Sequence, residues 1–258
     1  MATPDSIHIK GGIDACDLMD RFSEWCMHGA YTPFQENFDI GISTSQAIRR
    51  YAEGTDPFEC GGTAEGDNGN GSLMRILPVC LYLYERQKKI CTSENEAVHI
   101  LHKVSALTHG HIRSQMACGI YYFLVKSILE GTGTLIDRLQ KGMDQALSFY
   151  RQDFRNYTEL GSYDRLNDLR AFQMTPEDEI SSSGYVVHTL EASIWCLLNT
   201  DSYEQAVLKA VNLGADTDTV GAVAGGLAGL FYGYAQIPSE WLETIRKREW
   251  VEQLIRNE

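Results

Sequence analysis

Residues Thr219–Ser239 read TVGAVAGGLAGLFYGYAQIPS, a run without a single charged side chain. A run of this length and apolarity could span a membrane. Its five glycines and the acids directly before it favour instead a helix buried inside a helical protein. Gly221, Gly225, Gly229 and Gly233 recur at every fourth position, which places them on one helix face. Each costs about 1 kcal/mol relative to alanine, so we expect close packing of a neighbouring helix to compensate.

The apolar residues on both sides of this run also recur at helical spacing. Residues 136–150 predict an amphipathic helix, and Met116–Leu129 predicts a central helix that is apolar nearly all round. A capping box of Ser93 and Glu96 predicts the start of another helix. Further helices are expected over 94–107, 185–198 and 204–213, and long loops over 54–71 and 163–184. With no convincing alternating strands, the sequence predicts one all-α domain with two functional loops.

Composition narrows the classes of partner. The 258 residues carry 22 Lys and Arg against 35 Asp and Glu, a net charge of −13. This charge argues against nucleic acid and against an anionic membrane surface as partners. The seven cysteines are an odd number, are spread out and form no C-x-x-C pair. They indicate a reducing compartment. Since the first residues do not resemble a signal peptide, we expect a cytoplasmic protein.

The strongest chemical signal directly precedes the glycine-rich helix. Gly214–Thr219 reads GADTDT and brings two carboxylates and a hydroxyl into one helical turn. Asp216, Asp218 and Thr219 could therefore offer oxygen ligands to Mg²⁺, which prefers carboxylates and water. Helix capping is the simpler alternative, because Asp and Thr are favoured at helix starts. A bound cation becomes the better explanation of the motif if the helix buries its acidic end, because buried carboxylates need a cation or hydrogen-bond donors.

Two further motifs contain groups suited to ligand binding. Asp67–Arg75 reads DNGNGSLMR, and its glycines would let backbone N–H groups approach an anion at a helix start. Taken alone, Asn-Gly repeats are more often turns. Leu107–His111 reads LTHGH, but no third nitrogen or sulfur ligand is obvious. Each histidine is therefore better explained without a transition metal.

Taken together, these motifs resemble the ADP-ribosylglycohydrolase family. The GADTDT stretch with its trailing glycines resembles the family's C-terminal metal motif, and Gly69–Arg75 resembles its Gly-Asn-Gly-small-x-Met-Arg loop. Leu107–His109 resembles its Thr-His helix end, and Gly184–Ala192 resembles the segment before its penultimate helices. The resemblance follows the order and spacing of the motifs over nearly the whole chain.

The resemblance implies an all-α, orthogonally packed multi-helix bundle that hydrolyses ADP-ribose linkages with two Mg²⁺ ions. Asp216, Asp218 and Thr219 would be metal ligands. The substrate, ADP-ribose or an ADP-ribosylated protein, would contact two further groups of residues. The diphosphate or ribose would be held by Asn70, Gly71 and Ser72, and the cleft would be lined by His109 and Tyr185.

One feature of the family is missing. Its members also carry an N-terminal Thr-Asp-Asp-Thr motif that supplies the other half of the metal site, whereas this sequence contains no Asp-Asp pair. Residues 2–7 and 11–14 resemble the stretch just after that motif. Asp5, Asp14 and Asp17 could in principle replace the missing ligands, but solvated first-turn acids are the simpler interpretation. We therefore expect residues 1–258 to form a single N-terminally shortened domain with one or weak Mg²⁺ binding and no assigned catalytic acid. The alternative is a non-catalytic protein that retains an ADP-ribose or nucleotide cleft, or only the scaffold.

Overall fold

The core of the molecule is built around the buried helix α6 (Ile112–Glu130). The computed structural model describes residues 1–90 and 93–256, and within them the chain forms fourteen α-helices and no strand. Side chains on every face of α6 are buried, from Met116 to Ile128, as the uninterrupted apolar sequence predicted. The all-α class is thereby confirmed. The other helices are α1 (Ala2–Lys10), α2 (Ala15–His28), α3 (Ile42–Ala52), α4 (Leu77–Ile90), α5 (Glu94–Ala106), α7 (Leu135–Tyr150), α8 (Tyr157–Leu160), α9 (Leu169–Gln173), α10 (Val186–Leu198), α11 (Tyr203–Asn212), α12 (Thr217–Tyr232), α13 (Ser239–Thr244) and α14 (Arg248–Arg256).

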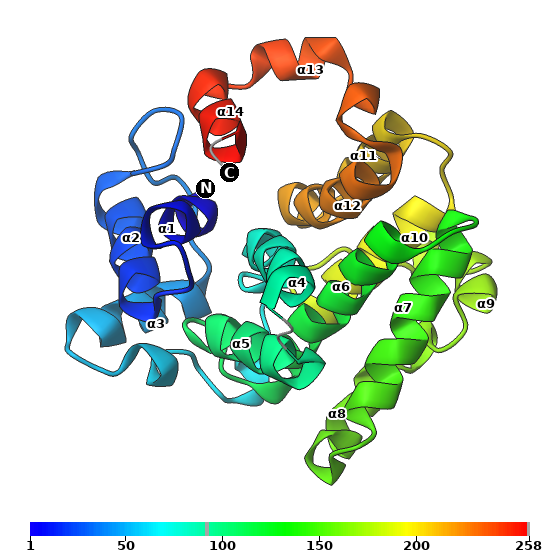
Figure 1. Ribbon diagram of the computed structural model, residues 1–258, viewed down its shortest axis with the longest axis horizontal. Helices are drawn as coiled ribbons and strands as arrows, with labels where there is room; N and C mark the ends of the chain where they lie inside the picture. The colour runs from blue at the N-terminus through cyan, green and yellow to red at the C-terminus, as the bar shows by residue number, and fades with distance from the viewer. Residues whose placement is uncertain (91–92, 257–258) are drawn as a thin grey trace.

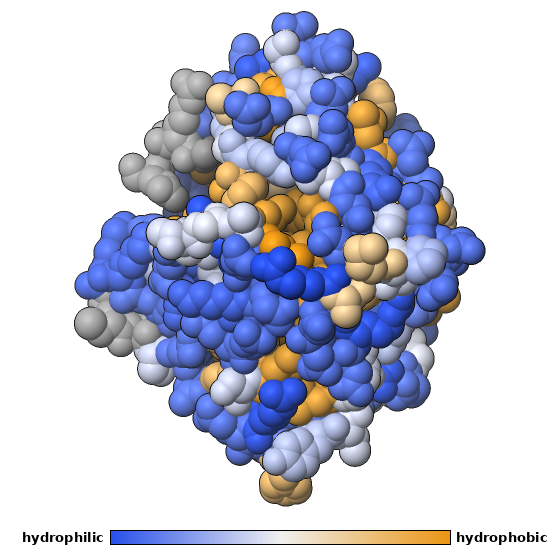
Figure 2. Space-filling model, turned by 90° about the vertical axis from the view of Figure 1, so that its right-hand side faces the viewer, coloured by the Kyte–Doolittle hydropathy of each residue, from blue (hydrophilic) through white to orange (hydrophobic). Residues whose placement is uncertain are grey.

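The helices fall into two groups on either side of α4 and α6. Helices α1 to α3 lie together on one side, and α10 to α12 lie on the other (Figure 1). The last helices, α13 and α14, run back across the molecule, and α14 packs beside α1, so the two termini lie close together (Figure 1). The face at the right of Figure 1 is mostly hydrophilic, in keeping with the net charge of −13 (Figure 2).

Helix starts and faces follow the local sequence closely. Ser93 caps α5 by accepting a hydrogen bond from the backbone N–H of Glu96 at 3.2 Å. Helix α7 buries Leu139, Met143 and Leu147 along one stripe, as its spacing predicted. No helix among the described residues combines the length and apolarity that a membrane crossing requires.

The glycine ridge of α12 packs as predicted over three of its four positions. A Cβ atom at Gly221 would lie 3.0 Å from Val211 on α11, and one at Gly225 would lie 3.4 Å from Val207. At Gly229 the nearest atom belongs to Tyr203, also on α11. Gly233 differs, because it ends the helix with φ +88°. The glycines of the ridge therefore allow α11 and α12 to pack closely. The helix ends at Tyr232, seven residues before the uncharged run ends at Ser239.

The N-terminal helices depart from the sequence interpretation. The sequence predicted solvated acids at Asp5, Asp14 and Asp17. Asp14 does cap α2 by accepting from the N–H of Asp17 at 3.0 Å. Asp5 and Asp17, however, both pair with Arg21, and these two carboxylates keep only 15% and 17% of their side-chain surface exposed. The half-buried guanidinium of Arg21, which sequence spacing alone does not reveal as their partner, holds both carboxylates.

The two long loops contain short helical turns. The first includes the 3₁₀ turns Pro57–Glu59 and Glu65–Asp67, and the second contains helix α9. Treating the second loop as wholly irregular was therefore wrong, because Asp168 caps α9 through two backbone N–H groups. The six described cysteines are free thiols, and Cys91 lies outside the described residues.

Candidate functional site

The acidic start of α12 lies on a tight turn. Gly214 and Ala215 both have positive φ, +87° and +48°, and the N–H of Asp216 donates to the carbonyl of Ser182 at 3.0 Å. Asp216 occupies the capping position of α12, yet its side chain makes no capping hydrogen bond. Asp216 therefore lacks the regular capping hydrogen bond, and a group from another part of the chain orients its carboxylate.

That group is Asn70, which comes from the glycine-rich loop 146 residues away in sequence. Its Nδ2 donates to Asp216 Oδ2 at 2.8 Å and to the hydroxyl of Thr189 at 2.8 Å. The backbone N–H of Asn70 donates to the carbonyl of Gly184 at 3.0 Å. The loop, the start of α10 and the start of α12 therefore meet at one amide side chain.

The charge state of this corner follows from these contacts. Burial alone would raise the pKa of Asp216, but the hydrogen bond from Asn70 and its other donors outweigh burial and lower that pKa. Asp216 is therefore a carboxylate at neutral pH, and the side chain of Asp218 lies within hydrogen-bonding reach of it. Asp218 is exposed, and its Oδ1 accepts the N–H of Thr219 at 2.8 Å.

The donor set at this corner suits a hard cation that keeps several waters. Asp216 and Asp218 place two neighbouring carboxylates at the start of α12. The Thr219 hydroxyl lies beside them, within hydrogen-bonding reach of Asp216 and 3.8 Å from the sulfur of Met74. Mg²⁺ commonly takes one or two carboxylates and completes its shell with water. Among the described residues, no cluster of three His, Cys, Asp or Glu side chains forms here or elsewhere.

The other residues of the loop have different surroundings. Gly71 approaches the His109 ring so closely that a Cβ atom would lie 2.8 Å from His109 Cε1. Ser72 is fully buried, and its hydroxyl accepts a hydrogen bond from Ser105 at 3.0 Å. The Ser72 side chain thus anchors the loop in the core, and its neighbours Asn70 and Gly71 are buried as well.

His109 is a buried, neutral ring under the loop. Only 2% of it is exposed, and its Nδ1 lies 2.7 Å from the Thr108 hydroxyl. Burial, and secondarily the charge of Arg75, lower the pKa of His109 to about 3. His111 faces elsewhere, since it caps α6 through the N–H of Arg113. The two histidine rings therefore have separate partners.

Tyr185 lies at the entrance to α10 and is held by an ion-pair network. Arg113 donates to the Tyr185 hydroxyl at 3.0 Å, to Glu159 at 2.7 Å and to Glu65. Tyr185 is half-buried, and Gly69 pairs with it through the backbone. Sequence analysis missed Arg113, because an arginine in the first turn of a helix carries no signal that separates it from a solvated one.

Comparison with known proteins fits this arrangement. A family model described as ADP-ribosylglycohydrolase matches residues 1–257. The ADP-ribosylarginine hydrolase Tri1 of Serratia proteamaculans is 29% identical over 246 residues, which cover 95% of this chain and 60% of that protein. The ADP-ribosyl-[dinitrogen reductase] glycohydrolase of Rhodospirillum rubrum is 29% identical over 248 residues, which cover 95% and 70%.

A solved structure shows the same fold. It is titled ADP-ribosylglycohydrolase-related protein complex, and it superposes with a TM-score of 0.73 at 29% identity over 98% of this chain and 76% of that one. The chain spans only about three fifths of the length of the two Tri1 relatives that it matches.

Proposed function

Because the chain belongs to the ADP-ribosylglycohydrolase family, we propose that it hydrolyses a glycosidic linkage between ADP-ribose and a modified protein or related conjugate. In that reaction water breaks the bond at the anomeric carbon of the ribose. The hydroxyl stays on that carbon, and the proton goes to the leaving side chain. The relatives named for ADP-ribosylarginine make arginine the first linkage to test. The contact between Asn70 and Asp216 at 2.8 Å is the single observation that carries the proposal, because it joins the ligand-binding loop to the acidic corner.

Each residue of the site has a task in this proposal. Asp216, Asp218 and Thr219 would hold Mg²⁺, and Asn70 would fix the carboxylate of Asp216. When bound, the cation would orient ribose hydroxyls and polarise a water. We expect this site to be weak or to take one ion, because two carboxylates leave most of an octahedral shell to water.

The remaining residues would bind and orient the rest of the substrate. Backbone N–H groups of the loop at Gly71 would contact the diphosphate, since glycine permits close approach. Tyr185, fixed by Arg113, would offer its ring to the ADP-ribose. His109 stays neutral and supports the loop, and Ser72 contributes by holding it in place. No described residue is assigned as the catalytic acid.

A second candidate is binding without turnover. The observation that favours it is the donor set of only two carboxylates beside Thr219, which no third acid, histidine or cysteine of the described residues completes. Calorimetry with ADP-ribose, run beside a product assay on ADP-ribosylated arginine and serine peptides, separates the two. Turnover supports the hydrolase, and binding without product supports the second candidate.

The role of Asp218 can be tested by melting. We expect Mg²⁺ to raise the Tm of the wild type and to leave that of Asp218→Ala unchanged, because a ligand stabilises only the state that binds it. In EDTA the variant should be as stable as the wild type or more stable, since the replacement relieves repulsion with Asp216. An equal loss of about 0.5–2 kcal/mol in both buffers would indicate a first-turn helix role alone. Tight binding of two Mg²⁺ ions would contradict the weak site.

A further inference from the structure

A hydrogen-bonded serine and histidine lie on either side of Tyr185, at the start of α10. Tyr185 occupies the capping position of that helix, but its own side chain makes no capping hydrogen bond. The hydroxyl of Ser183 takes over this task, since Ser183 Oγ accepts the backbone N–H of Tyr185 at 3.4 Å. Ser183 Oγ also lies 2.8 Å from Nδ1 of His188, in the first turn of α10. The two side chains therefore form a pair that spans the start of the helix.

The direction of this hydrogen bond follows from its surroundings. Ser183 Oγ already accepts from Tyr185, and the structure gives its proton no acceptor other than His188 among the described residues. Burial, and secondarily the charge of Arg165, lower the pKa of His188, and Arg165 itself pairs with Glu191 at 2.7 Å. The half-buried ring of His188 is therefore neutral at neutral pH. Ser183 donates to its Nδ1, which assigns the ring proton to Nε2.

The segment that contains Ser183 provides the backbone acceptors of the acidic corner. The carbonyl of Ser182 accepts the N–H of Asp216 at 3.0 Å, and the carbonyl of Gly184 accepts that of Asn70 at the same distance. Ser183 lies between these two acceptors, so its side chain fixes the peptide units that carry them. A Cβ atom at Gly184 would lie 3.3 Å from Asp216 Oδ2, which leaves the segment little room to shift.

A second bond joins the same segment to α10. The hydroxyl of Thr189, the residue after His188, donates to the carbonyl of Ser183 at 3.2 Å. It also accepts from the side chain of Asn70 at 2.8 Å. The ring of His188 packs edge-on against that of Tyr185, with centroids 4.9 Å apart and planes at 90°. His188 therefore contacts both the segment before α10 and the aromatic ring that we expect to meet ADP-ribose.

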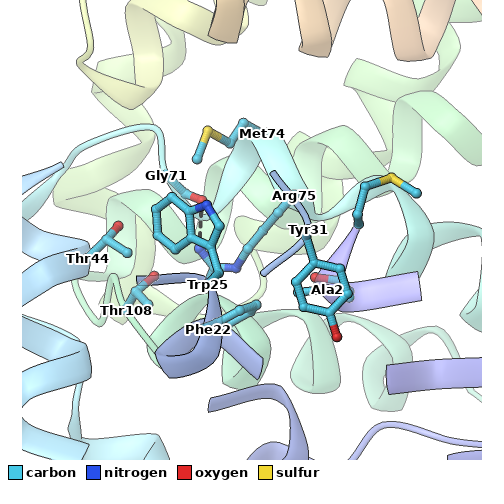
Figure 3. Close-up of a pocket in the computed structure, with 11 residues that line it drawn as sticks. Ala2, Phe22, Trp25, Tyr31, Thr44, Gly71, Met74, Arg75 and Thr108 are labelled. Atoms are coloured by element: carbon cyan, nitrogen blue, oxygen red, sulfur yellow. Dashed lines mark hydrogen bonds between the residues drawn. The ribbon is translucent and has the colours of Figure 1, made fainter. Parts of the chain in front are cut away.

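The glycine-rich loop has a separate anchor one residue after Asn70. Arg75 Nη1 donates to the carbonyl of Gly71 at 2.6 Å (Figure 3). Its Nη2 donates to the carbonyl of Val104 on α5 at 3.2 Å. These bonds tie the loop to α5 and leave Asn70 to be placed by α10 and the segment before it. The position of Asn70 thus depends on the peptide units that Ser183 fixes.

We propose that His188 is a positioning residue that, through Ser183, holds Asn70 and Asp216 in place for ADP-ribose. This role rests on the proposed function, since ADP-ribose is the ligand that the two residues would serve. It requires an acceptor at the place of Nδ1. A simple helix cap differs in this respect, because it needs only the hydroxyl of Ser183 and leaves His188 dispensable.

Calorimetry of the full chain with ADP-ribose tests this role. His188→Leu removes the acceptor and should weaken binding by about three- to tenfold, the contribution of one hydrogen bond. His188→Asn should stay within about twofold of the wild type, because the amide oxygen of asparagine can accept at the place of Nδ1. Ser183→Ala should match His188→Leu, and the double variant should lose no more than either single variant, because both remove the same bond.

His102→Gln is the matched control. His102 Nε2 also lies 2.8 Å from a hydroxyl, that of Tyr150, but neither residue belongs to the candidate site. Its Kd for ADP-ribose should equal that of the wild type. His188→Ala takes the place of His188→Leu if that variant does not fold.

Hydrogen exchange tests the same contact without a ligand. In His188→Leu and Ser183→Ala, the amides of Asn70 and Asp216 should exchange about three- to tenfold faster relative to those of α6, and His188→Asn should restore the wild-type ratio. An unchanged Kd or an unchanged ratio in His188→Leu would overturn the role of His188, as would additive losses in the double variant. An effect confined to Ser183→Ala would leave capping as the account. Faster exchange in His188→Leu, together with a wild type that binds no ADP-ribose, would uphold the positioning and refute the proposed function.

Discussion

We expect the sharpest single-residue effect on stability when Gly226 is replaced. It lies beside the predicted ridge of α12 and faces α6. A Cβ atom there would lie 2.6 Å from the hydroxyl of Tyr121 and 2.9 Å from Leu77 Cδ2. The Tyr121 side chain cannot swing away freely, because it is 1% exposed and its hydroxyl donates to the carbonyl of Val223 at 3.1 Å.

The magnitude for Gly226→Ala follows from three contributions. Overpacking costs about 2 kcal/mol, and disturbing the hydrogen bond of Tyr121 costs about 1 kcal/mol. Better helix propensity returns about 1 kcal/mol, so the net loss is about 2 kcal/mol. For a chain of this size the loss lowers Tm by roughly 4–8 °C. Thermal unfolding followed by far-ultraviolet circular dichroism measures it.

Gly229→Ala is the matched control on the same helix. Its Cβ would meet only Tyr203 Cε2 at 3.8 Å, an ordinary contact, so the gain of about 1 kcal/mol in propensity should raise Tm. Tyr121→Phe combined with Gly226→Ala should cost less than the sum of the two single changes, because the hydroxyl and the new methyl compete for one space. If Gly226→Ala raises Tm as Gly229→Ala does, the close contact with α6 is refuted.

Three further predictions concern buried groups elsewhere. Burial lowers the pKa of His102 to about 4 from 6.5, so between those pH values the unfolded chain binds a proton that the folded chain does not, and stability is lost as pH falls through them. In urea titrations, His102→Gln should flatten the slope of unfolding free energy against pH by up to about 1.4 kcal/mol per pH unit. An unaltered slope would contradict this prediction. Arg113→Met leaves the carboxylate of Glu159, which is 12% exposed, without its partner and should cost about 3 kcal/mol of stability in a thermal melt. Glu65→Gln, whose carboxylate is 73% exposed, should leave Tm unchanged. Equal losses in the two variants would refute the difference between the buried and the exposed ion pair. Gly225→Leu should lower Tm by forcing α11 from α12, and a Tm at or above the wild-type value would show that this face tolerates a side chain.

The sequence predicted those parts of the fold that local chemistry determines. Helices α5, α6 and α7 follow from apolar spacing and from the cap at Ser93, both of which act over a few residues. The ridge on α12 was predicted from its four-residue period, but Gly226, the tightest glycine on that helix, lies outside the period. Its partner is Tyr121, more than a hundred residues away, and no local pattern encodes such a contact.

The candidate site was predictable only in its separate parts. Asp216 and Asn70 each appeared within a motif, but their hydrogen bond depends on tertiary packing. Arg113 had no signal, since an ion pair to Glu159 leaves no trace in the sequence around either residue. Only the structure shows that Asp216 lacks the regular capping hydrogen bond, because by sequence position every Asp directly before a helix is a candidate cap.

The backbone bonds that join the loop to α10 and α12 have a kinetic consequence. The N–H groups of Asn70, Val186 and Asp216 donate to Gly184, Asn68 and Ser182, and two of these three bonds span more than a hundred residues. Contacts of such high sequence separation form late, after local helices, so the acidic corner should assemble near the end of folding. The same three amides should exchange their hydrogens with solvent only through a larger cooperative opening. Helix ends elsewhere, such as the last turn of α13, should exchange by fraying, at rates set within a single element.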